Sequence, residues 1–451
     1  MQVTGMVRSK PRMALVLGLG ATGLSCVRYL SARGYSVRVA DSRQSPPMLA
    51  QLQAEFPGMA VHTGPWDSSV FLGADLLVVS PGLSLRAPGI AGAIAAGRAA
   101  VGDIELFAQE ASAPVIAITG SNGKSTVTTL VGEICRASGL DAAVGGNIGT
   151  PALELLRKPE PAVYVLELSS FQLETTASLN ARSATILNIT PDHMDRYRDI
   201  EEYAVAKGRV FRGDGVMVLN REDPAVMAMA RPDRRTLYFG LSSPRNDADY
   251  GLLRQGREEW LARGSELIMP VSELRLAGRH NIANALAAAA LVDVVGVPFA
   301  AIRRVLGEFA GLRHRTEVVG DHAGVLWIND SKGTNVGATV AALNGMERPV
   351  VLIAGGDGKG ADFSQLRDAV RSRVRGIVLI GRDAPLIEQA LGDLATVARA
   401  EDMFDAVRKA ADLARPGDTV LLSPACASFD MFRNYEHRGD VFREAVGRVI
   451  G

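Results

Sequence analysis

The chain has 451 residues with 49 basic and 49 acidic side chains, and its formal charge of zero argues against a nucleic-acid or anionic-membrane partner. Its three widely spaced cysteines, Cys26, Cys135 and Cys426, argue against a disulfide framework and for a reducing compartment. Residues 1–12 lack a signal-peptide pattern and the longest alanine-rich stretch, 283–292, is too short to span a bilayer, so we expect a soluble cytoplasmic protein.

The first segment of the chain, residues 1–102, alternates short aliphatic runs with helix-length stretches. Strands are expected at 14–18, 36–40 and 75–80, and a helix at 24–33. Such alternation indicates βαβ units on a parallel sheet. Gly18, Gly20 and Gly23 have the spacing of a dinucleotide fingerprint, and Asp41 ends the next strand. The pattern predicts a site for a nucleotide-bearing ligand and leaves the reaction open, with the alternative that Asp41 only ends its strand.

The second segment, residues 103–311, repeats this alternation on a larger scale. Strands are expected at 114–119, 162–167, 184–188 and 215–220, and an alanine-rich helix after His280. These elements predict a larger α/β domain. Residues 231–267 are polar and poorly periodic, so no structure is predicted there.

A glycine-rich loop follows the first strand of this segment. It comprises Gly120, Ser121, Asn122, Gly123, Lys124, Ser125 and Thr126. Glycines let backbone N–H groups approach phosphate oxygens, Lys124 can reach the terminal phosphates, and Ser125 can bind Mg²⁺. The generic pattern has glycine where Ile118 stands, so this loop is a shortened variant. It predicts ATP as the ligand, against the alternative of an ordinary turn between a strand and a helix.

The third segment, residues 312–451, alternates in the same way. Strands are expected at 325–329, 350–354, 376–380 and 419–423. We therefore predict an α/β protein of three domains, divided near Gly102 and Gly311.

Several motifs in the last two segments resemble those of the Mur ligase family. They are GSNGKST at 120–126, GGNIG at 145–149, LELSSFQ at 166–172, NITPDHMDR at 188–196, GRHNIANA at 278–285, WINDSKGTN at 327–335, GGDGK at 355–359 and SPACASFD at 423–430. The resemblance covers essentially the whole chain, and the sequence around Asp330 is most similar to members that add D-glutamate. It implies a Rossmann-like domain for a UDP substrate at 1–102, a P-loop ATPase-like domain with a parallel sheet at 103–311, and a Rossmann-like domain for D-glutamate and part of ATP at 312–451.

The resemblance also implies a reaction. A Mur ligase of this kind joins D-glutamate to UDP-N-acetylmuramoyl-L-alanine through an acyl phosphate, forming ADP, in peptidoglycan precursor synthesis. It implies ATP, two Mg²⁺ ions and a carbamate formed from CO₂ on Lys207 as cofactors. We expect a monomer without a nucleic-acid or membrane partner.

Roles are carried over by matched position. Catalytic roles are implied for Lys124, His193 and Lys207. The two Mg²⁺ ions are assigned to Ser125, Glu167, His193 and Lys207. ATP is assigned to residues 120–126 together with Asn281, Arg315 and Asp330. The UDP substrate is assigned to Thr22, Asp41, Ser42, Arg43, Gly82 and Asn147. D-glutamate is assigned to Thr334, Lys359, Ser428 and Phe429. Because ATP contacts fall in two domains, the third domain is expected to close over the P-loop.

Each assignment has a simpler alternative. Glu167 could form a structural salt bridge, His193 could be a loop histidine, and Asp330 could cap a helix. Lys207 could be a solvent-exposed helix lysine. Cys426 lacks a partner pattern and is interpreted as a small packed residue.

The chain departs from the family pattern at three positions. Ala21 replaces a larger aliphatic residue, Arg313 replaces a proline, and Phe429 replaces a leucine. These departures affect the expected contacts more than the expected reaction.

Three other functions remain open from the residues alone. They are a related ligase that adds another amino acid, an NAD-dependent oxidoreductase, and a nucleotide-dependent binding module without catalysis. No hydride-transfer site accompanies the dinucleotide fingerprint. Phosphate release that requires both UDP-N-acetylmuramoyl-L-alanine and D-glutamate would separate the predicted ligase from these alternatives.

Overall fold

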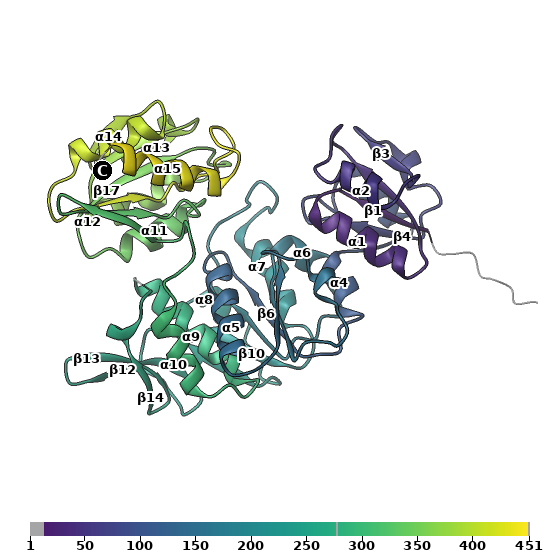
Figure 1. Ribbon diagram of the computed structural model, residues 1–451, viewed down its shortest axis with the longest axis horizontal. Helices are drawn as coiled ribbons and strands as arrows, with labels where there is room; N and C mark the ends of the chain where they lie inside the picture. The colour runs from purple at the N-terminus through teal and green to yellow at the C-terminus, as the bar shows by residue number, and fades with distance from the viewer. Residues whose placement is uncertain (1–12, 277, 450–451) are drawn as a thin grey trace, which may run out of the picture.

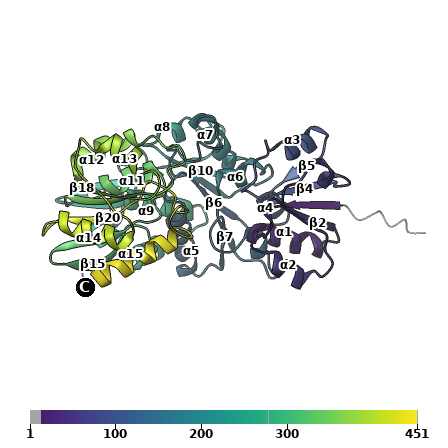
Figure 2. The same cartoon turned by 90° about the horizontal axis from the view of Figure 1, so that it is seen from above.

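The computed structural model describes residues 13–276 and 278–449, which form three α/β bodies in chain order (Figure 1). Figure 2 shows these bodies in a row, with the central one between the other two. Residues 1–12, where the sequence lacks a signal-peptide pattern, lie outside the described part. Within the described ranges no helix is long and apolar enough to cross a membrane.

The N-terminal body is a parallel sheet with helices on its faces. Its described strands run in the order β3-β2-β1-β4-β5, and all neighbours are parallel. The strands are β1 (Met13–Leu17), β2 (Ser36–Asp41), β3 (Val61–Thr63), β4 (Leu76–Val79) and β5 (Ala99–Val101). The helices are α1 (Ala21–Ala32), α2 (Leu49–Glu55), the short η1 (Ser68–Phe71) and α3 (Pro88–Ala95). The strand order reverses between β1 and β4, which is where ligands bind in open sheets of this kind.

The central body contains a mixed sheet of nine strands in the described residues, in the order β14-β13-β12-β11-β10-β9-β6-β8-β7. The strands are β6 (Val115–Thr119), β7 (Ala142–Gly146), β8 (Val163–Glu167), β9 (Ser183–Ile186), β10 (Val216–Asn220), β11 (Thr236–Phe239), β12 (Tyr250–Gln255), β13 (Glu258–Arg263) and β14 (Glu266–Pro270). The helices are α4 (Asp103–Ala108), α5 (Lys124–Ala137), η2 (Ala152–Leu155), α6 (Ser170–Glu174), α7 (Ile200–Gly208), η3 (Arg209–Phe211), α8 (Pro224–Met227), η4 (Val271–Glu273), α9 (Arg279–Asp293) and α10 (Phe299–Glu308).

The alanine-rich helix α9 packs on α5 at the centre of this body. Its side chains from Ala285 to Val292 are fully buried. Alanine brings helix backbones close together and has the highest helix propensity, so a long uninterrupted run can form a buried helix. The two helices cover one face of the sheet and set the position of the P-loop, which opens α5.

The third body contains a six-stranded sheet, counted over the described residues, in the order β15-β16-β20-β17-β18-β19. Only β15 is antiparallel to its neighbour. The strands are β15 (Glu317–His322), β16 (Val325–Asn329), β17 (Val350–Gly355), β18 (Val374–Ile380), β19 (Thr396–Arg399) and β20 (Thr419–Leu422). The helices are α11 (Val336–Asn344), η5 (Phe363–Leu366), α12 (Arg367–Arg373), α13 (Ala384–Leu391), α14 (Met403–Leu413) and α15 (Tyr435–Val449).

The predicted three-domain α/β fold is confirmed, and every strand expected from an aliphatic run is present within about three residues. Residues 231–267, for which no structure was predicted, contain β11 to β13 and the start of β14. β11 continues the parallel part of the central sheet, whereas β12, β13 and β14 pair antiparallel with one another at its edge. Some residues at the ends of β12 and β14 are exposed, so their hydrophobic pattern is weak. We propose that the three sheets mark domains at 1–102, 103–311 and 312–451.

The first two bodies share a buried junction at α4. Ile104 and Phe107 pack in one apolar cluster with Val16 and Val27 of the first body and Tyr164 of the second. The Phe107 and Tyr164 rings meet edge to face at 5.0 Å between centroids. The junction therefore joins the first body to the central one through packed side chains as well as through the chain itself.

Candidate functional site

The P-loop connects β6 to α5 with backbone geometry that glycine supplies. Gly120 has φ 148° and Gly123 has φ 83°, and a side chain at Gly123 would meet Asn284 Oδ1 at 2.6 Å. Lys124 Nζ folds back over the loop and donates to the carbonyl oxygens of Gly120 and Ser121, both at 2.8 Å. Desolvation lowers the pKa of Lys124, although Glu167 and other nearby carboxylates oppose the shift. The Lys124 amine is thus held over the P-loop by two backbone carbonyls.

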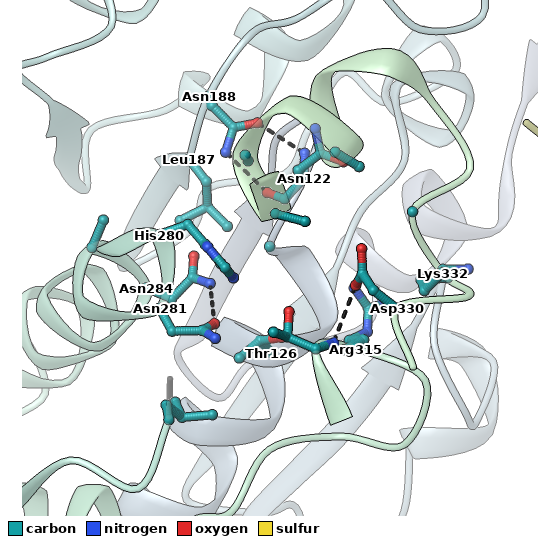
Figure 3. A pocket seen from close by; sticks show the side chains of 18 of the residues that line it. Asn122, Thr126, Leu187, Asn188, His280, Asn281, Asn284, Arg315, Asp330 and Lys332 are labelled. Atoms are coloured by element: carbon teal, nitrogen blue, oxygen red, sulfur yellow. Dashed lines mark hydrogen bonds between the residues drawn. The ribbon is translucent and has the colours of Figure 1, made fainter. Parts of the chain in front are cut away.

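Asn188 fixes the shape of this loop from the end of β9. Its backbone oxygen accepts from Ser121 N at 2.9 Å, and its Oδ1 accepts from Asn122 N at 2.8 Å. Its Nδ2 donates to Asn122 O at 3.1 Å (Figure 3). These three bonds fix the conformation of the P-loop backbone at Ser121 and Asn122.

An interdomain cleft of about 280 Å³ lies between the central and third bodies. It is lined by Thr126, Asn281, Arg315 and Asp330, among others, and Figure 3 shows these side chains around one space. Arg315 Nη2 donates to Ser125 Oγ at 2.6 Å, so a third-body cation already reaches the P-loop. The cleft thus brings together part of the set that the sequence assigned to ATP, namely Asn122, Gly123, Thr126, Asn281, Arg315 and Asp330. Ser121, Lys124 and Ser125 of the same set line the central cavity instead.

Asp330 is buried at the end of β16 and does not cap a helix. Its Oδ1 accepts from Thr316 N at 3.1 Å and its Oδ2 accepts from Ser423 Oγ at 2.8 Å. The following helix, α11, is capped by Asn335, whose Oδ1 accepts from Ala338 N. The helix-cap alternative is therefore wrong. Burial raises the pKa of Asp330 to about 6, while the bonds from Ser423 and Thr316 lower it.

A central cavity of about 420 Å³ is lined by residues from all three bodies. The first body contributes Gly82, and the third contributes Lys332, Thr334 and Lys359. The central body contributes Lys124, Ser125, Asn147, Glu167, His193 and Lys207. Several cations therefore surround one space, which suits a ligand with concentrated negative charge.

Glu167, the last residue of β8, points a carboxylate oxygen into this cavity without a protein partner. Its Oε1 accepts from Asn147 Nδ2 at 2.8 Å, whereas its buried Oε2 accepts no hydrogen bond in the described structure. The side-chain partner of Glu167 in the described residues is the Asn147 amide and not a cation, so the structural salt-bridge alternative is wrong. A buried oxygen of this kind is costly unless a cation or donor binds it.

His193 follows β9 in a strained conformation, with φ 60°. Its ring lies 4.7 Å from the Phe171 ring centroid, and its Nε2 lies 3.7 Å from Asp192 Oδ2. Burial lowers the pKa of His193, and the nearby Lys359 lowers it further although Asp192 opposes the shift. A neutral imidazole at this place can act as a metal ligand or hydrogen-bond partner. Its strain is typical of functional positions and argues against a plain loop histidine.

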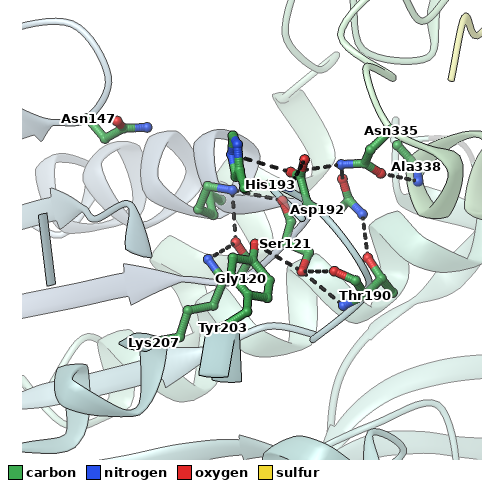
Figure 4. A network of polar contacts seen from close by, with 12 residues as sticks. Gly120, Ser121, Asn147, Thr190, Asp192, His193, Tyr203, Lys207, Asn335 and Ala338 are labelled. Carbon is green, nitrogen blue, oxygen red and sulfur yellow. Dashed lines mark hydrogen bonds and ion pairs between the residues drawn. The ribbon is translucent and has the colours of Figure 1, made fainter. Parts of the chain in front are cut away.

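Lys207 lies on α7 and is 1 % exposed, so the exposed-lysine alternative is wrong. Its Nζ donates to Gly120 O at 2.9 Å and lies 4.5 Å from the Tyr203 ring centroid (Figure 4). The pKa of Lys207 is well below its usual value because of burial and the charge of Lys124. Both lysines donate to Gly120 O, so the two amines lie side by side at one acceptor.

The first-domain cavity, about 580 Å³, lies at the carboxyl ends of β1, β2 and β4. The residues assigned to the UDP substrate line it, namely Thr22, Asp41, Ser42, Arg43, Gly82 and Asn147, and so does Ala21. Asp41 accepts from Leu19 N at 2.7 Å and from Arg43 Nη2 at 2.6 Å. Burial raises the pKa of Asp41, but the bonds from Arg43 and Leu19 outweigh it and lower the value to about 2. Asp41 therefore organises the cavity wall as an anion as well as ending β2.

The residues assigned to D-glutamate are only partly brought together. Thr334 and Lys359 line a side cavity of about 170 Å³ together with His193. A bridge between Asp357 and Ala427 places the loop of Ser428 beside the loop of Lys359. Ser428 is buried and lines none of these cavities.

Two of the positions noted in the sequence lie away from the cavities. Phe429 is 73 % exposed, and Arg313 is an exposed residue paired with Asp440. Cys426 is buried in the third core, as a packed residue should be.

Two residues near the cavities were missed by the sequence assignments. Lys332 lines both the interdomain cleft and the central cavity, and its Nζ lies 3.7 Å from the Tyr435 ring centroid. Burial lowers the pKa of Lys332 to about 8. Asp192 faces His193 and accepts from Asn335 Nδ2 at 3.1 Å. Both residues lie inside quoted motifs, so their neighbourhood in the sequence was the available signal.

The contact between Asn335 and Asp192 docks the third body on the His193 loop (Figure 4). Gly337 allows the two bodies to approach closely here, because a Cβ at this position would lie 2.7 Å from Thr190 Oγ1. We expect Asn335→Asp to weaken docking, since it can still cap α11 but sets a second carboxylate against Asp192. Small-angle scattering should give a larger radius of gyration for this variant than for Asn335→Ser, which caps without the added charge. Equal radii for the two variants would contradict the docking role.

In the described part of the chain, no group of three or more His, Cys, Asp or Glu side chains is arranged to hold a metal ion. The assigned ligands instead comprise a hydroxyl, a carboxylate, an imidazole and an amine. Oxygen donors suit Mg²⁺, which usually keeps water and substrate phosphates as further ligands.

Comparison with known proteins agrees with this arrangement. Models of the MurD-like N-terminal domain, the Mur ligase middle domain and the glutamate ligase domain match residues 12–102, 118–292 and 314–426. The UDP-N-acetylmuramoylalanine–D-glutamate ligase of Thiobacillus denitrificans is 53% identical, over 97% of this chain and 96% of the relative. The enzyme of the same name from Methylobacillus flagellatus is 54% identical, over 98% of each chain.

Solved structures agree on the fold. A pseudomurein peptide ligase type C from Methanothermus fervidus has a TM-score of 0.63 and 19% identity, covering 97% of this chain and 100% of its own. The UDP-N-acetylmuramate-alanine ligase MurC from Thermotoga maritima has a TM-score of 0.60 and 18% identity, covering 97% and 99%. From its domain matches and its near full-length relatives, the chain belongs to the Mur ligase family.

Proposed function

We propose that the protein joins D-glutamate to UDP-N-acetylmuramoyl-L-alanine with conversion of ATP to ADP and phosphate, in peptidoglycan precursor synthesis. The observation that carries this proposal is the central cavity, where the P-loop meets Gly82 of the first domain and Lys359 of the third. Such an arrangement suits a reaction that brings three substrates to one place. The names of the near full-length relatives support the same activity.

The chemistry explains the need for several cations. A carboxylate is a poor electrophile, so the L-alanyl carboxylate must first attack the γ-phosphate of ATP to form an acyl phosphate. The D-glutamate amine then displaces phosphate and forms the amide. Negative oxygens approach one another in the first step, and Lys124 and Lys332 at the cavity wall can offset that repulsion. Holding the reactants in place supplies much of the remaining acceleration.

Mg²⁺ fits the donors of the central cavity. The unpartnered Oε2 of Glu167 and the hydroxyl of Ser125 offer oxygen ligands for one ion, and His193 and Lys207 are proposed to serve a second. When bound, Mg²⁺ neutralises phosphate charge and orients the transferring group. Arg315 donates to the Ser125 hydroxyl and lines both the interdomain cleft and the central cavity, so its guanidinium is within reach of phosphates bound at the P-loop.

Lys207 fits the proposed carbamate. A buried amine that is neutral can add CO₂, and the product is an anionic oxygen ligand suited to a hard cation. The described structure gives Lys207 no carboxylate within ion-pairing distance, and its bonds to Gly120 O and Thr119 Oγ1 are all donations. Carbamate formation would place a negative charge beside the ammonium of Lys124 and add an attraction there.

We further propose that the protein works as a cytoplasmic monomer. ATP and UDP-linked precursors are soluble cytoplasmic compounds, and no nucleic-acid or membrane partner is proposed.

The activity is tested by measuring phosphate release with a panel of amino acids. We expect release only when UDP-N-acetylmuramoyl-L-alanine and D-glutamate are both present. Release with another amino acid would favour a related ligase, and binding of nucleotide without release would favour a module without catalysis. A reaction that depends on NAD would support the oxidoreductase alternative.

Lys359 is expected to set the preference for D-glutamate. It lines the side cavity with Thr334, and its backbone is in the left-handed region with φ 52°. We expect Lys359→Ala to raise the KM for D-glutamate about tenfold to a hundredfold, because a charged hydrogen bond to a carboxylate is lost. Steady-state kinetics should show an ATP KM near that of the wild type. An equal rise in both constants would place Lys359 at the nucleotide instead.

A further inference from the structure

A single guanidinium connects the first domain to the His193 loop. Arg196 lies in the loop between β9 and α7, and its side chain is 12 % exposed. Its Nη1 donates to Pro81 O at 2.8 Å, and its Nη2 donates to Leu83 O at 3.1 Å. Both carbonyls belong to the first-domain loop that contains Gly82.

The central domain holds the other side of the same guanidinium. Arg196 Nη2 also donates to Glu174 Oε2 at 2.8 Å, and its Cζ lies 4.0 Å from the Phe171 ring centroid. Glu174 in turn accepts from the Tyr197 hydroxyl at 2.6 Å. A planar guanidinium enclosed by a carboxylate, a ring and two carbonyls has a fixed orientation that an ammonium cannot reproduce.

The backbone links Arg196 to His193. The N–H groups of Arg196 and Tyr197 both donate to His193 O, at 2.9 and 3.1 Å. The Phe171 ring also lies between the two side chains, since it contacts the His193 ring on one side and the Arg196 guanidinium on another. A displacement of Arg196 would therefore be transmitted to His193.

The first-domain loop is a wall shared by two cavities. Pro81 and Gly82 line both the first-domain cavity and the central cavity. Ser80 Oγ donates to Gly18 O at 3.0 Å, which ties the loop to the glycine-rich turn after β1. The position of this loop thus sets how the two cavities are joined.

We propose that Arg196 is a positioning residue that holds the 81–83 loop against the His193 loop, and so places a UDP substrate relative to the reacting groups. The inference rests on the proposed function, because it takes the two cavities to hold the two ends of one substrate. Arg196 acts through the carbonyls of Pro81 and Leu83 and through His193. It is not assigned to the reacting atoms.

A second ion pair across the same junction supplies a matched control. Arg86 of the first domain pairs with Glu202 on α7, but its side chain is 62 % exposed. Exposed pairs contribute little because water screens them. Arg86→Met therefore removes an arginine that pairs across the domain junction. It leaves the buried hydrogen bonds of the Arg196 guanidinium in place.

The test compares Arg196→Lys with this control. We expect Arg196→Lys to raise the KM for UDP-N-acetylmuramoyl-L-alanine about tenfold, because one ammonium cannot donate to both carbonyls and Glu174 in the same geometry. The ATP KM should stay within about twofold of the wild type, and so should both constants of Arg86→Met. Amide hydrogen exchange in residues 80–86 should be faster in Arg196→Lys, with exchange in β17 unchanged.

Two results would overturn the proposal. One is a folded Arg196→Lys variant with unchanged KM and unchanged exchange in residues 80–86. The other is an equal rise of all three substrate KM values, as general loss of structure would give. If Arg196→Lys does not fold, the same readouts are made on Glu174→Gln, which keeps the side-chain length but removes the charge and one acceptor oxygen beside the guanidinium. A wild-type protein without coupled phosphate release would defeat the proposed function, whereas the exchange comparison would still decide the role of Arg196.

Discussion

Lys124→Ala is expected to lower kcat about a thousandfold while the protein stays folded. The lysine caps the P-loop by donating to Gly120 O and Ser121 O, and its ammonium is the P-loop cation closest to transferred phosphate in the proposed reaction. The measurement is phosphate release under saturating substrates. Circular dichroism and thermal unfolding would establish that the variant is folded.

The control for this experiment depends on Lys124 lining the central cavity and not the first-domain cavity. Lys124 does not line the first-domain cavity, so calorimetric binding of UDP-N-acetylmuramoyl-L-alanine should persist in Lys124→Ala. Lys158→Ala, which removes an exposed lysine from the same domain, should keep wild-type turnover. Near-wild-type activity in folded Lys124→Ala would falsify the P-loop assignment.

Lys207→Ala is expected to be nearly inactive, with a loss of at least about a hundredfold in kcat, and to recover in part when short carboxylic acids are added. Truncation leaves space beside Gly120 O and removes the proposed carbamate oxygens. Acetate or formate can occupy that space and present similar oxygens. The measurement is phosphate release as a function of carboxylate concentration.

Lys207→Arg separates the carbamate from a need for positive charge. Arginine keeps a cation at this position but does not form a carbamate, and its larger side chain fills the space that an added carboxylate would use. We expect Lys207→Arg to be inactive and not to respond to acetate. Full activity in Lys207→Ala, or rescue by arginine alone, would end the carbamate hypothesis.

The central strands of each sheet were predictable because they are buried on both faces. β1, β6 and β17 are continuous aliphatic runs, and short runs of this kind are typical of strands buried on both faces of a parallel sheet. The antiparallel strands β12 and β13 were not predicted. Many of their residues are only partly buried, and their position depends on pairing with β11 and with each other.

The candidate site was predicted in its residue types but only partly in its contacts. The P-loop motif gave the glycines and Lys124 together, because a phosphate loop is local in sequence. Lys332 was not assigned, although it lies two residues after Asp330, because only the packing of the third domain turns it toward the cavities. Ser428 was assigned to D-glutamate, but in the structure it is buried away from the cavities described here.

By itself the sequence determined three α/β units, a P-loop, a dinucleotide-type turn and a resemblance to the Mur ligases. Those features are local, since they depend on hydrophobic period and on residues a few positions apart. The tertiary structure decided which side chains share a cavity, that Glu167 Oε2 is buried without a partner, that Lys207 is buried, and that Arg196 bridges two domains. Those properties depend on contacts between residues far apart in the chain, and burial and pKa values follow from the assembled surroundings instead of from the residue type.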